Sequence, residues 1–124
     1  MSKRESDAVR RPEEIVRQYF ELLDKHLDDL IKGNATQMMQ LKEIASALHI
    51  SHYHLTDTVK RTKGHHPCHF YDLKIIERAK QMLTETDEPI AQIAITLTYD
   101  PSNFSKFFKK LTGETPGEFR QRKK

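Results

Sequence analysis

The sequence predicts an all-α protein with two helix-turn-helix subdomains joined by a long linker helix, plus an extra N-terminal amphipathic helix. Two observations lead to this prediction. Apolar residues recur at steps of three and four along the longer segments, which is typical of helices that bury one face. A pattern of apolar, glycine and proline positions also repeats after 49 residues, which indicates a duplicated unit.

Residues 12–37 are predicted to form the N-terminal helix and a following loop. Pro12 suits the first helical position, and Glu13 and Glu14 suit the positive end of the helix dipole. The apolar stripe comprises Ile15, Val16, Tyr19, Phe20, Leu23, Leu27, Leu30 and Ile31. Because the opposite face is acidic, we expect this helix to pack against the chain or against a second copy. Residues 1–11 are polar and are expected to be disordered.

The repeat begins near residue 41 and runs without a gap. Ile44-Ala45 recurs as Ile93-Ala94, and Gly64 recurs as Gly113. The other matching pairs are Leu48 and Leu97, Ile50 and Tyr99, Leu55 and Phe104, Val59 and Phe108, Lys60 and Lys109, Pro67 and Pro116, and Phe70 and Phe119. The two residues of each pair are of the same chemical type, and every pair has the same offset. This number of matches indicates an internal duplication.

Each copy of the repeat has the pattern of two short helices joined by a tight turn. In the first unit, residues 38–66, the turn His49-Ile50 is followed by Ser51 as N-cap of a helix that ends at Gly64. In the second unit, residues 85–124, Asp100-Pro101 supplies an N-cap and a first-turn proline. The side chains expected to face the core from these second helices are Leu55, Val59, Thr62, Phe104, Phe108 and Leu111.

Residues 67–84 are predicted to form the linker helix, which would hold the two units at a fixed separation. Its apolar face is expected to include Leu73, Ile76, Ala79 and Leu83. Farther on, Thr115-Pro116-Gly117-Glu118 has the spacing of a capping box, so a short last helix is expected there.

The composition argues against several classes of protein. No stretch approaches the roughly 20 apolar residues of a membrane span. The first residues lack the apolar run of a signal peptide, and Cys68, the single cysteine, has no partner for an internal disulfide. A cytoplasmic protein is therefore expected. Charge is uneven, because residues 101–124 hold seven Lys or Arg against two Glu, whereas residues 12–30 hold six acids against two bases. The basic end is suited to face phosphate.

The second helix of a helix-turn-helix unit is the one that enters the DNA major groove, so double-stranded DNA is the expected partner. The side chains opposite the core-facing ones are His52, Tyr53, Thr56, Asp57 and Lys60 in the first unit, and Ser102, Asn103, Lys106 and Lys110 in the second. Phosphate contacts are expected from Lys60, Arg61, Lys63, Lys109, Lys110 and the backbone N–H groups at helix starts. Because Asp57 is negative, we expect the second unit to supply more of the electrostatic affinity.

Residues 38–122 resemble the AraC/XylS-type transcriptional regulators. The strongest stretch is IAQIAITLTYDPSNFSKFFKKLTGETPGEFR, residues 90–120, in which the run from Phe104 to Arg120 is similar to the signature of the family's second unit. The resemblance implies two homeodomain-like subdomains that enter successive major grooves on one face of the DNA, in an activator or a repressor of transcription. By position it implies contacts from Tyr53, His54, Thr56 and Asp57, and from Ser102, Asn103 and Lys106.

The sequence departs from the family's pattern at three places. Asp57 stands where the family usually has Arg, which bears on base readout by the first unit. Thr98 replaces a usual Gly before Tyr99, which bears on the geometry of the turn. The segment from Tyr99 to Phe104 is one residue shorter than is common in the second unit, which bears on the placement of the recognition helix.

Other functions fit the sequence less well. The run His65-His66-Pro67-Cys68-His69 crowds imidazoles and a thiol, but adjacent ligands converge poorly on one ion, so no metal or other cofactor is expected. Phosphate-binding glycine loops, metal-binding His/Glu motifs and a nucleophile in a recognisable setting are all missing, so an enzyme is not expected. A module that binds only other proteins is the alternative interpretation of this sequence. A salt titration of binding to random duplex would distinguish it from a DNA binder.

Regulators of this type commonly carry a separate sensing or dimerisation domain ahead of the DNA-binding part. The sequence therefore leaves open either a small single-domain regulator or the C-terminal DNA-binding fragment of a longer effector-sensing regulator. RNA polymerase, a dimer partner and a sensing domain are the further candidate partners, and no membrane partner is expected.

Overall fold

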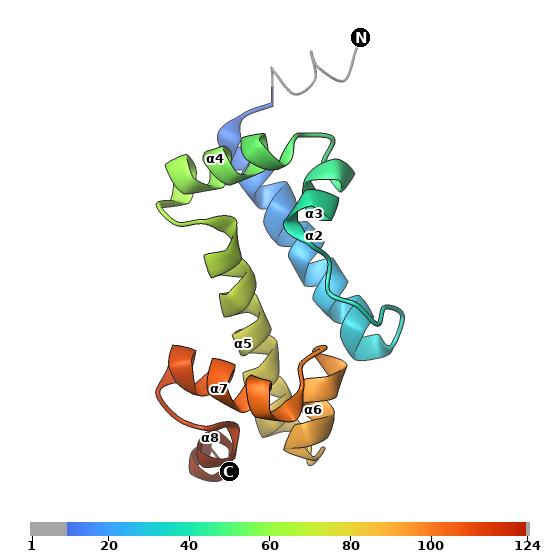
Figure 1. The fold of residues 1–124 in the computed structure, drawn as a ribbon, viewed down its shortest axis with the longest axis vertical. Helices are drawn as coiled ribbons and strands as arrows, with labels where there is room; N and C mark the ends of the chain where they lie inside the picture. The colour runs from blue at the N-terminus through green and yellow to red at the C-terminus, as the bar shows by residue number, and fades with distance from the viewer. Residues whose placement is uncertain (1–9, 124) are drawn as a thin grey trace. The chain divides into compact units, whose positions relative to one another are not determined.

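A computed structural model describes residues 10–123, and all regular secondary structure in that range is helical (Figure 1). In chain order the helices are α2 (Pro12–Lys32), α3 (Leu41–Ala47), α4 (His52–Lys63), α5 (Pro67–Glu85), α6 (Ile90–Thr96), α7 (Pro101–Thr112) and α8 (Pro116–Lys123). The pairs α3–α4 and α6–α7 are the two helix-turn-helix units. The prediction of an all-α fold with two such units is confirmed.

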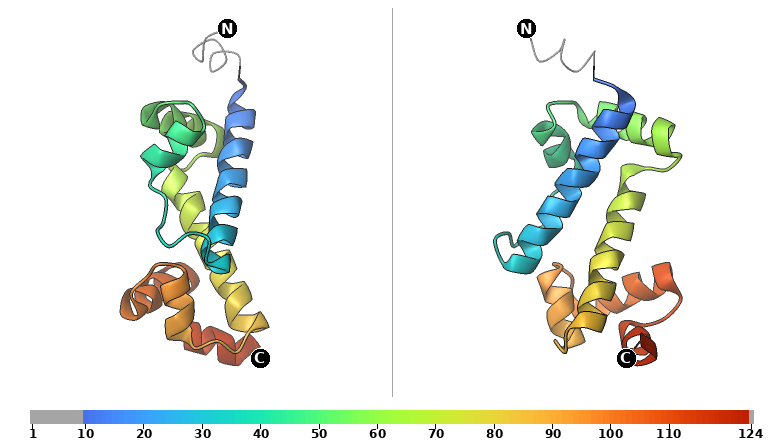
Figure 2. Two further views of the ribbon diagram at one scale, coloured as in Figure 1. Left: turned by 90° about the vertical axis from the view of Figure 1, so that its right-hand side faces the viewer. Right: turned by 180° about the vertical axis from the view of Figure 1, so that it is seen from behind.

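The described residues fall into two compact bodies, called unit 1 and unit 2, and each contains one of the helix-turn-helix pairs. Unit 1 runs up to His26 and continues over Met39–Asp72, so it holds most of α2, all of α3 and α4, and the start of α5. Unit 2 combines Leu27–Met38 with the residues from Leu73 onward, so it holds the end of α2, the rest of α5, and α6 to α8. The helices of each unit can be followed from two further sides in Figure 2. The domain boundaries predicted from the sequence, which treat α2 and α5 as separate segments, stay a prediction.

The sequence repeat is matched helix by helix. Helices α3 and α6 both have seven residues, and α4 and α7 both have twelve. Gly64 and Gly113 follow α4 and α7 in the left-handed conformation, with φ of 83° and 88°. The N–H of each glycine donates to the carbonyl four residues earlier at 2.8 Å. The duplicated sequence therefore builds the same local geometry twice.

The turn between the two helices is also the same in both units. The N–H of Ile50 donates to the carbonyl of Ala45 at 3.0 Å, and the equivalent bond of unit 2 measures 2.8 Å. This is the longer bond of a Schellman motif, which needs a left-handed residue, usually glycine. His49 and Thr98 occupy that position with φ of 62° and 70°. Thr98 in place of the family's glycine thus keeps the turn and its hydrogen bonds, at the cost of backbone strain.

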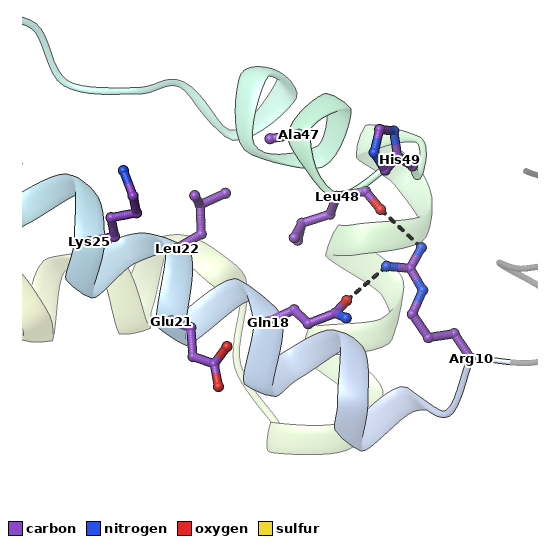
Figure 3. A pocket seen from close by; sticks show the side chains of 8 residues that line it. All are labelled: Arg10, Gln18, Glu21, Leu22, Lys25, Ala47, Leu48 and His49. Atoms are coloured by element: carbon purple, nitrogen blue, oxygen red, sulfur yellow. Dashed lines mark hydrogen bonds between the residues drawn. The ribbon is translucent and has the colours of Figure 1, made fainter.

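Arg10 holds the C-terminal end of α3. Its Nη2 donates to the carbonyl of Leu48 at 2.9 Å, and its Nη1 donates to Oε1 of Gln18 on α2 at 2.8 Å (Figure 3). The carbonyls of the last helical turn have no partner within the helix, and Arg10 supplies one of them with a donor. Of the stretch predicted to be disordered, residues 1–9 lie outside the described residues, whereas Arg10 is held by these two bonds.

The core of unit 1 is built by α2, α3, α4 and the start of α5. Tyr19, Leu23, Ile44 and Leu55 are fully buried. The hydroxyl of Tyr19 donates to the carbonyl of Pro67 at 2.9 Å, and burial is the main reason that its pKa lies well above the ordinary value. Helix α2 therefore packs within the chain, which is one of the two roles expected for it.

The core of unit 2 is rich in aromatic rings. Phe104 and Phe108 of α7 are fully buried, and Phe108 packs edge-on against Phe119 of α8 with ring centres 5.6 Å apart. Helix α8 starts with the predicted capping box, because the N–H of Thr115 donates to the Glu118 carboxylate at 2.8 Å and the N–H of Glu118 donates to the Thr115 hydroxyl at 3.1 Å. These bonds lower the pKa of Glu118.

Three positions of the predicted apolar faces are wrong. Leu111 on α7 is 40% exposed, Leu73 on α5 is 45% exposed, and Ile31 near the end of α2 is 36% exposed. In α4 the buried hydroxyl residue is Thr58, whereas Thr62 is half-buried. A helix on the surface buries only the arc that faces its neighbours, so apolar residues at the edge of that arc remain in contact with water.

Candidate nucleic-acid interface

Helix α7 presents a polar and basic face to solvent. The exposed residues on this face are Ser102, Asn103, Lys106, Lys109 and Lys110. Phe104 and Phe108 on the opposite side are buried, which fixes the direction of the exposed face. With 3.6 residues per turn, the five side chains lie within about one third of the helix circumference. The structure thus brings all five predicted residues of the second unit onto one face.

Asp100 holds the N-terminus of α7. Its Oδ2 accepts from the hydroxyl of Ser102 at 2.6 Å, from the N–H of Ser102 at 3.2 Å and from the N–H of Asn103 at 3.4 Å. These hydrogen bonds, that of the Ser102 hydroxyl first, hold the pKa of the Asp100 carboxyl below its ordinary value. Because its hydroxyl proton is engaged by Asp100, Ser102 is prepared to accept a hydrogen bond from a ligand rather than to donate one.

Helix α4 presents the equivalent positions of unit 1. Counted along the repeat, Tyr53, His54, Asp57, Lys60 and Arg61 correspond to Ser102, Asn103, Lys106, Lys109 and Lys110. Among the exposed large hydrophobic residues that the structure describes, Tyr53 is the most open, with 79% of its surface accessible. Lys60 and Arg61 are also exposed, whereas His54, Thr56 and Asp57 are half-buried. The predicted first-unit residues therefore lie on or beside one face of α4.

Ser105 was not among the predicted residues, although it occupies the position of Thr56 in the repeat. Both side chains are half-buried at the edge of their helix's exposed face, so the repeat itself was the signal that could have identified Ser105. Lys63, expected to contact phosphate, lies with its ammonium 5.9 Å from the centre of the Phe20 ring, within the range of a cation–π interaction.

The two exposed faces differ in charge. Oδ1 of Asp57 accepts from Nε of Arg61 at 3.0 Å, an ion pair between residues one turn apart on α4. This hydrogen bond raises the pKa of Arg61. The corresponding residues of α7 are Lys106 and Lys110, which are both cationic. This difference in charge supports the expectation that unit 2 attracts phosphate more strongly. The ion pair of Asp57 and Arg61 could have been predicted from the sequence, because an acid four residues before a base is the favoured spacing on a helix.

The C-terminal arginines are engaged within unit 2. Arg120 donates from Nε to the carbonyl of Leu83 at 3.0 Å and from Nη2 to the carbonyl of Thr86 at 3.4 Å, at the end of α5. Arg122 donates to both carboxylate oxygens of Glu114, at 3.2 and 2.9 Å. Both side chains have partners within unit 2, so the basic surface offered by unit 2 comes mainly from the lysines of α7.

The histidine-rich turn before α5 has the contacts of a structural turn. Among residues 10–123, no three His, Cys, Asp or Glu side chains are grouped closely enough to hold a metal ion. The rings of His65 and His69 stack with centres 4.3 Å apart, and Nδ1 of His66 accepts from the N–H of Cys68 at 3.0 Å. Desolvation, together with the charge of Asp72, raises the pKa of the Cys68 thiol, which disfavours the thiolate needed for nucleophilic attack or metal binding.

None of the helices within residues 10–123 is both long enough and apolar enough to span a membrane.

Comparison with known proteins identifies the family. A family model described as a helix-turn-helix domain matches residues 44–122, the range that contains both recognition helices. The chain belongs to the AraC family of helix-turn-helix DNA-binding domains. The resemblance noted in the sequence is thereby confirmed.

Curated relatives of this AraC-family domain are bacterial regulators. The bifunctional transcriptional activator/DNA repair enzyme AdaA of Bacillus subtilis is 32% identical over 108 residues, which are 86% of this chain and 49% of AdaA. The MmsAB operon regulatory protein of Pseudomonas aeruginosa is 35% identical over 86 residues, which are 68% of this chain and 28% of that protein. The chain thus spans about half or less of the length of these relatives.

Solved structures share the fold. The C-terminal domain of AraT, a response regulator from Geobacillus stearothermophilus, superposes with a TM-score of 0.75 at 28% identity, covering 87% of this chain and 84% of that domain. The DNA-binding domain of AdpA, a global transcriptional factor solved in complex with a target DNA, has a TM-score of 0.70 at 15% identity, covering 84% and 90%. At that identity the likeness to AdpA concerns the fold alone.

Proposed function

We propose that this AraC-family domain binds double-stranded DNA in a sequence-specific manner in transcriptional regulation, with α4 and α7 in successive major grooves. The observation that carries the proposal is the exposed face of α7, where Asn103 and three lysines stand opposite a buried aromatic stripe. An α-helix fits the major groove of B-DNA, and the second helix of each helix-turn-helix unit is the one that enters it. The complex of the AdpA domain with DNA shows that a domain of this fold binds DNA, which supports the same use here.

Helix α7 is proposed to supply both readout and affinity. The amide of Asn103 has the donor and acceptor that match adenine, and Lys106 can donate to guanine. Lys109 and Lys110, farther along the same face, are suited to phosphate oxygens. Base contacts specify the sequence and phosphate contacts position the helix, so the two roles predict different effects of substitution.

Helix α4 is proposed to contribute apolar and polar contacts in its own groove. Tyr53 and Thr56, together with His52 and His66, line a shallow hollow beside the start of α4. Such a surface suits the methyl group of thymine, which is the apolar feature of the major groove. Lys60 is exposed farther along the helix and is proposed to contact phosphate.

The proposal assigns DNA binding, rather than catalysis, to this domain, and places its action in the cytoplasm. The DNA repair activity in the name of AdaA is a property of that protein, of which this chain spans 49%. Contacts with RNA polymerase, a second copy or a sensing domain are proposed as further partnerships of a regulator, and binding to DNA does not depend on them.

A salt titration of binding to random duplex tests the proposal. If Lys60, Lys109 and Lys110 each neutralise one phosphate, the plot of log affinity against log salt has a slope of about −2.7. The double substitution of Lys109 and Lys110 by Gln is expected to reduce that slope by about 1.8. As a matched control, Lys32→Gln at the exposed end of α2 should leave the slope unchanged. No binding at about 50 mM salt would refute the proposal.

Footprinting tests whether both units dock. Two protected segments are expected on one face of the duplex, with centres about 10 base pairs apart, because successive major grooves are separated by one helical turn. Protection of a single short segment would contradict the use of both recognition helices.

A further inference from the structure

The pair of Asp57 and Arg61 on α4 is fully formed, yet it lies open to solvent. Nε of Arg61 donates to Oδ1 of Asp57 at 3.0 Å, while 80% of the arginine side chain and 37% of the aspartate side chain remain accessible. The acid precedes the base by one helical turn, which is the favoured order for such a pair. Exposed ion pairs contribute little to folding stability. Folding stability alone is therefore a poor explanation for the acidic Asp57 on this face of α4.

The hydrogen bond determines how the guanidinium is presented. A guanidinium is planar and carries five N–H donors, of which the bond to Asp57 uses the one on Nε. Once Nε is held, the plane of the group is set and its tip, formed by Nη1 and Nη2, offers two parallel donors. Two parallel donors match O6 and N7 of guanine in the major groove, which is the commonest specific contact of arginine.

The bond also moves the charge along the helix. Asp57 lies four residues before Arg61, so it is about 6 Å nearer the N-terminus of α4. The N-terminal part of a recognition helix is the part that contacts base edges. The pairing therefore holds Nε of Arg61 toward Asp57, and so toward the residues that are proposed to read bases.

The second unit lacks this arrangement. The equivalent residues are Lys106 and Lys110, whose ammonium groups are flexible point charges and cannot form the planar two-donor contact. A carboxylate on the groove face weakens attraction to phosphate, so Asp57 lowers general affinity. A gain in selectivity would offset that loss.

We propose that Asp57 is a positioning residue that aims the guanidinium of Arg61 at a guanine in the major groove. The inference rests on the proposed DNA binding and assigns a base to one position of its site. It differs from the role expected from the sequence, in which Arg61 contacts phosphate. In that role, removal of Asp57 would simply strengthen binding to every sequence.

The experiment compares full chains that carry Asp57→Ala or Arg61→Lys with the wild type on duplexes selected from a random pool. Asp57→Ala is expected to raise affinity for random duplex and to steepen the salt slope by about 0.9, because Arg61 becomes free to neutralise a phosphate. At one guanine, discrimination against other bases should fall about fivefold or more. Arg61→Lys keeps the charge but loses the fork, so it should lose the same discrimination without losing random-duplex affinity.

Replacement of that guanine by 7-deazaguanine removes the N7 acceptor and leaves the base pair intact. The wild type should bind the modified duplex about fivefold or more weakly. Asp57→Ala should bind the modified and unmodified duplexes equally, since its arginine is no longer aimed at this base.

Glu21→Ala is the matched control. Glu21 accepts from Arg17 at 2.8 Å in another exposed pair with the same spacing, on α2 of the same unit. Its removal changes the net charge as Asp57→Ala does and should leave discrimination unchanged. Alanine is a strong helix former, and circular dichroism checks that both variants retain their helices.

Two results would overturn the inference. Full discrimination at every guanine in Asp57→Ala would show that the carboxylate does not position Arg61. Undiminished discrimination at every guanine in Arg61→Lys would make Arg61 a phosphate contact, because such a contact needs only the charge, which lysine keeps. Either result leaves the proposed function standing, whereas failure of the wild type to bind any duplex at low salt would refute both.

Discussion

Replacement of Thr98 by glycine is expected to stabilise the domain. Thr98 occupies the left-handed position of the turn between α6 and α7, with φ of 70°, and it is exposed. In that conformation the Cβ atom crowds the following carbonyl oxygen, and a β-branched residue suffers most. Glycine has no Cβ, and it keeps the backbone hydrogen bond from residue 98 to the carbonyl of Ile95, which measures 2.9 Å.

The magnitude follows from two opposing contributions. The left-handed conformation costs an L residue about 1–2 kcal/mol. Glycine gains more freedom in the unfolded chain, which costs the folded state about 0.5–1 kcal/mol. Because the Thr98 side chain is exposed, little packing is lost, and the net gain is expected to be about 0.5–1 kcal/mol.

Urea unfolding followed by circular dichroism measures this gain. With a denaturant slope of about 2 kcal/mol per molar, the midpoint should rise by about 0.3–0.5 M. His49→Gly changes the equivalent residue of unit 1, where φ is 62°. It should stabilise less, because histidine tolerates the left-handed region better than a β-branched residue does.

Gln92→Gly is the control for the effect of glycine itself. Gln92 is exposed within α6, so its replacement should destabilise the domain by about 1 kcal/mol. If Thr98→Gly proves as destabilising as Gln92→Gly, the turn does not store the strain inferred from its backbone angle.

Three further predictions concern α7. Lys106→Ala is expected to weaken DNA binding and to relax selectivity at one base position, as measured by selection from a random duplex pool; an equal loss for all sequences would make Lys106 a phosphate contact. Asp100→Ala is expected to lower the urea midpoint at neutral pH. Since the folded-state pKa of Asp100 lies below its unfolded value, the cap contributes fully above about pH 4 and is lost as the pH falls through the folded-state pKa, so wild type and variant should converge in strong acid. A difference that persists there would contradict the capping role. Phe108→Ala removes a fully buried ring and should cost about 3–5 kcal/mol in urea unfolding. A cost below about 1 kcal/mol would show that this ring does not hold α7 in place.

Much of the fold could be predicted because its signals are local. The predicted caps Ser51 and Asp100 both accept from backbone N–H groups at the starts of α4 and α7. Gly64 and Gly113 close those helices as expected. A cap and a helix-ending glycine act on residues within one turn of the chain, so the sequence carries their effect directly.

The candidate site was predictable in part. The faces of α4 and α7 follow from helical periodicity, because the buried stripe of each helix defines the exposed one. The partners of long polar side chains do not follow from periodicity. Arg120 illustrates this, since it counts toward the basic end of the sequence, residues 101–124, but donates to the carbonyl of Leu83 in the structure.

The amino-acid sequence by itself determined the AraC-type pair of helix-turn-helix units and the polar face of each recognition helix. Repeats, caps and helical periods are encoded by neighbouring residues. Only the tertiary structure decided which basic side chains of unit 2 are bonded within the fold and which stay exposed. It bonds Arg120 and Arg122 inside unit 2 and leaves the lysines of α7 exposed. The physical reason is that such bonds depend on which elements pack together, and that packing brings together groups far apart along the chain.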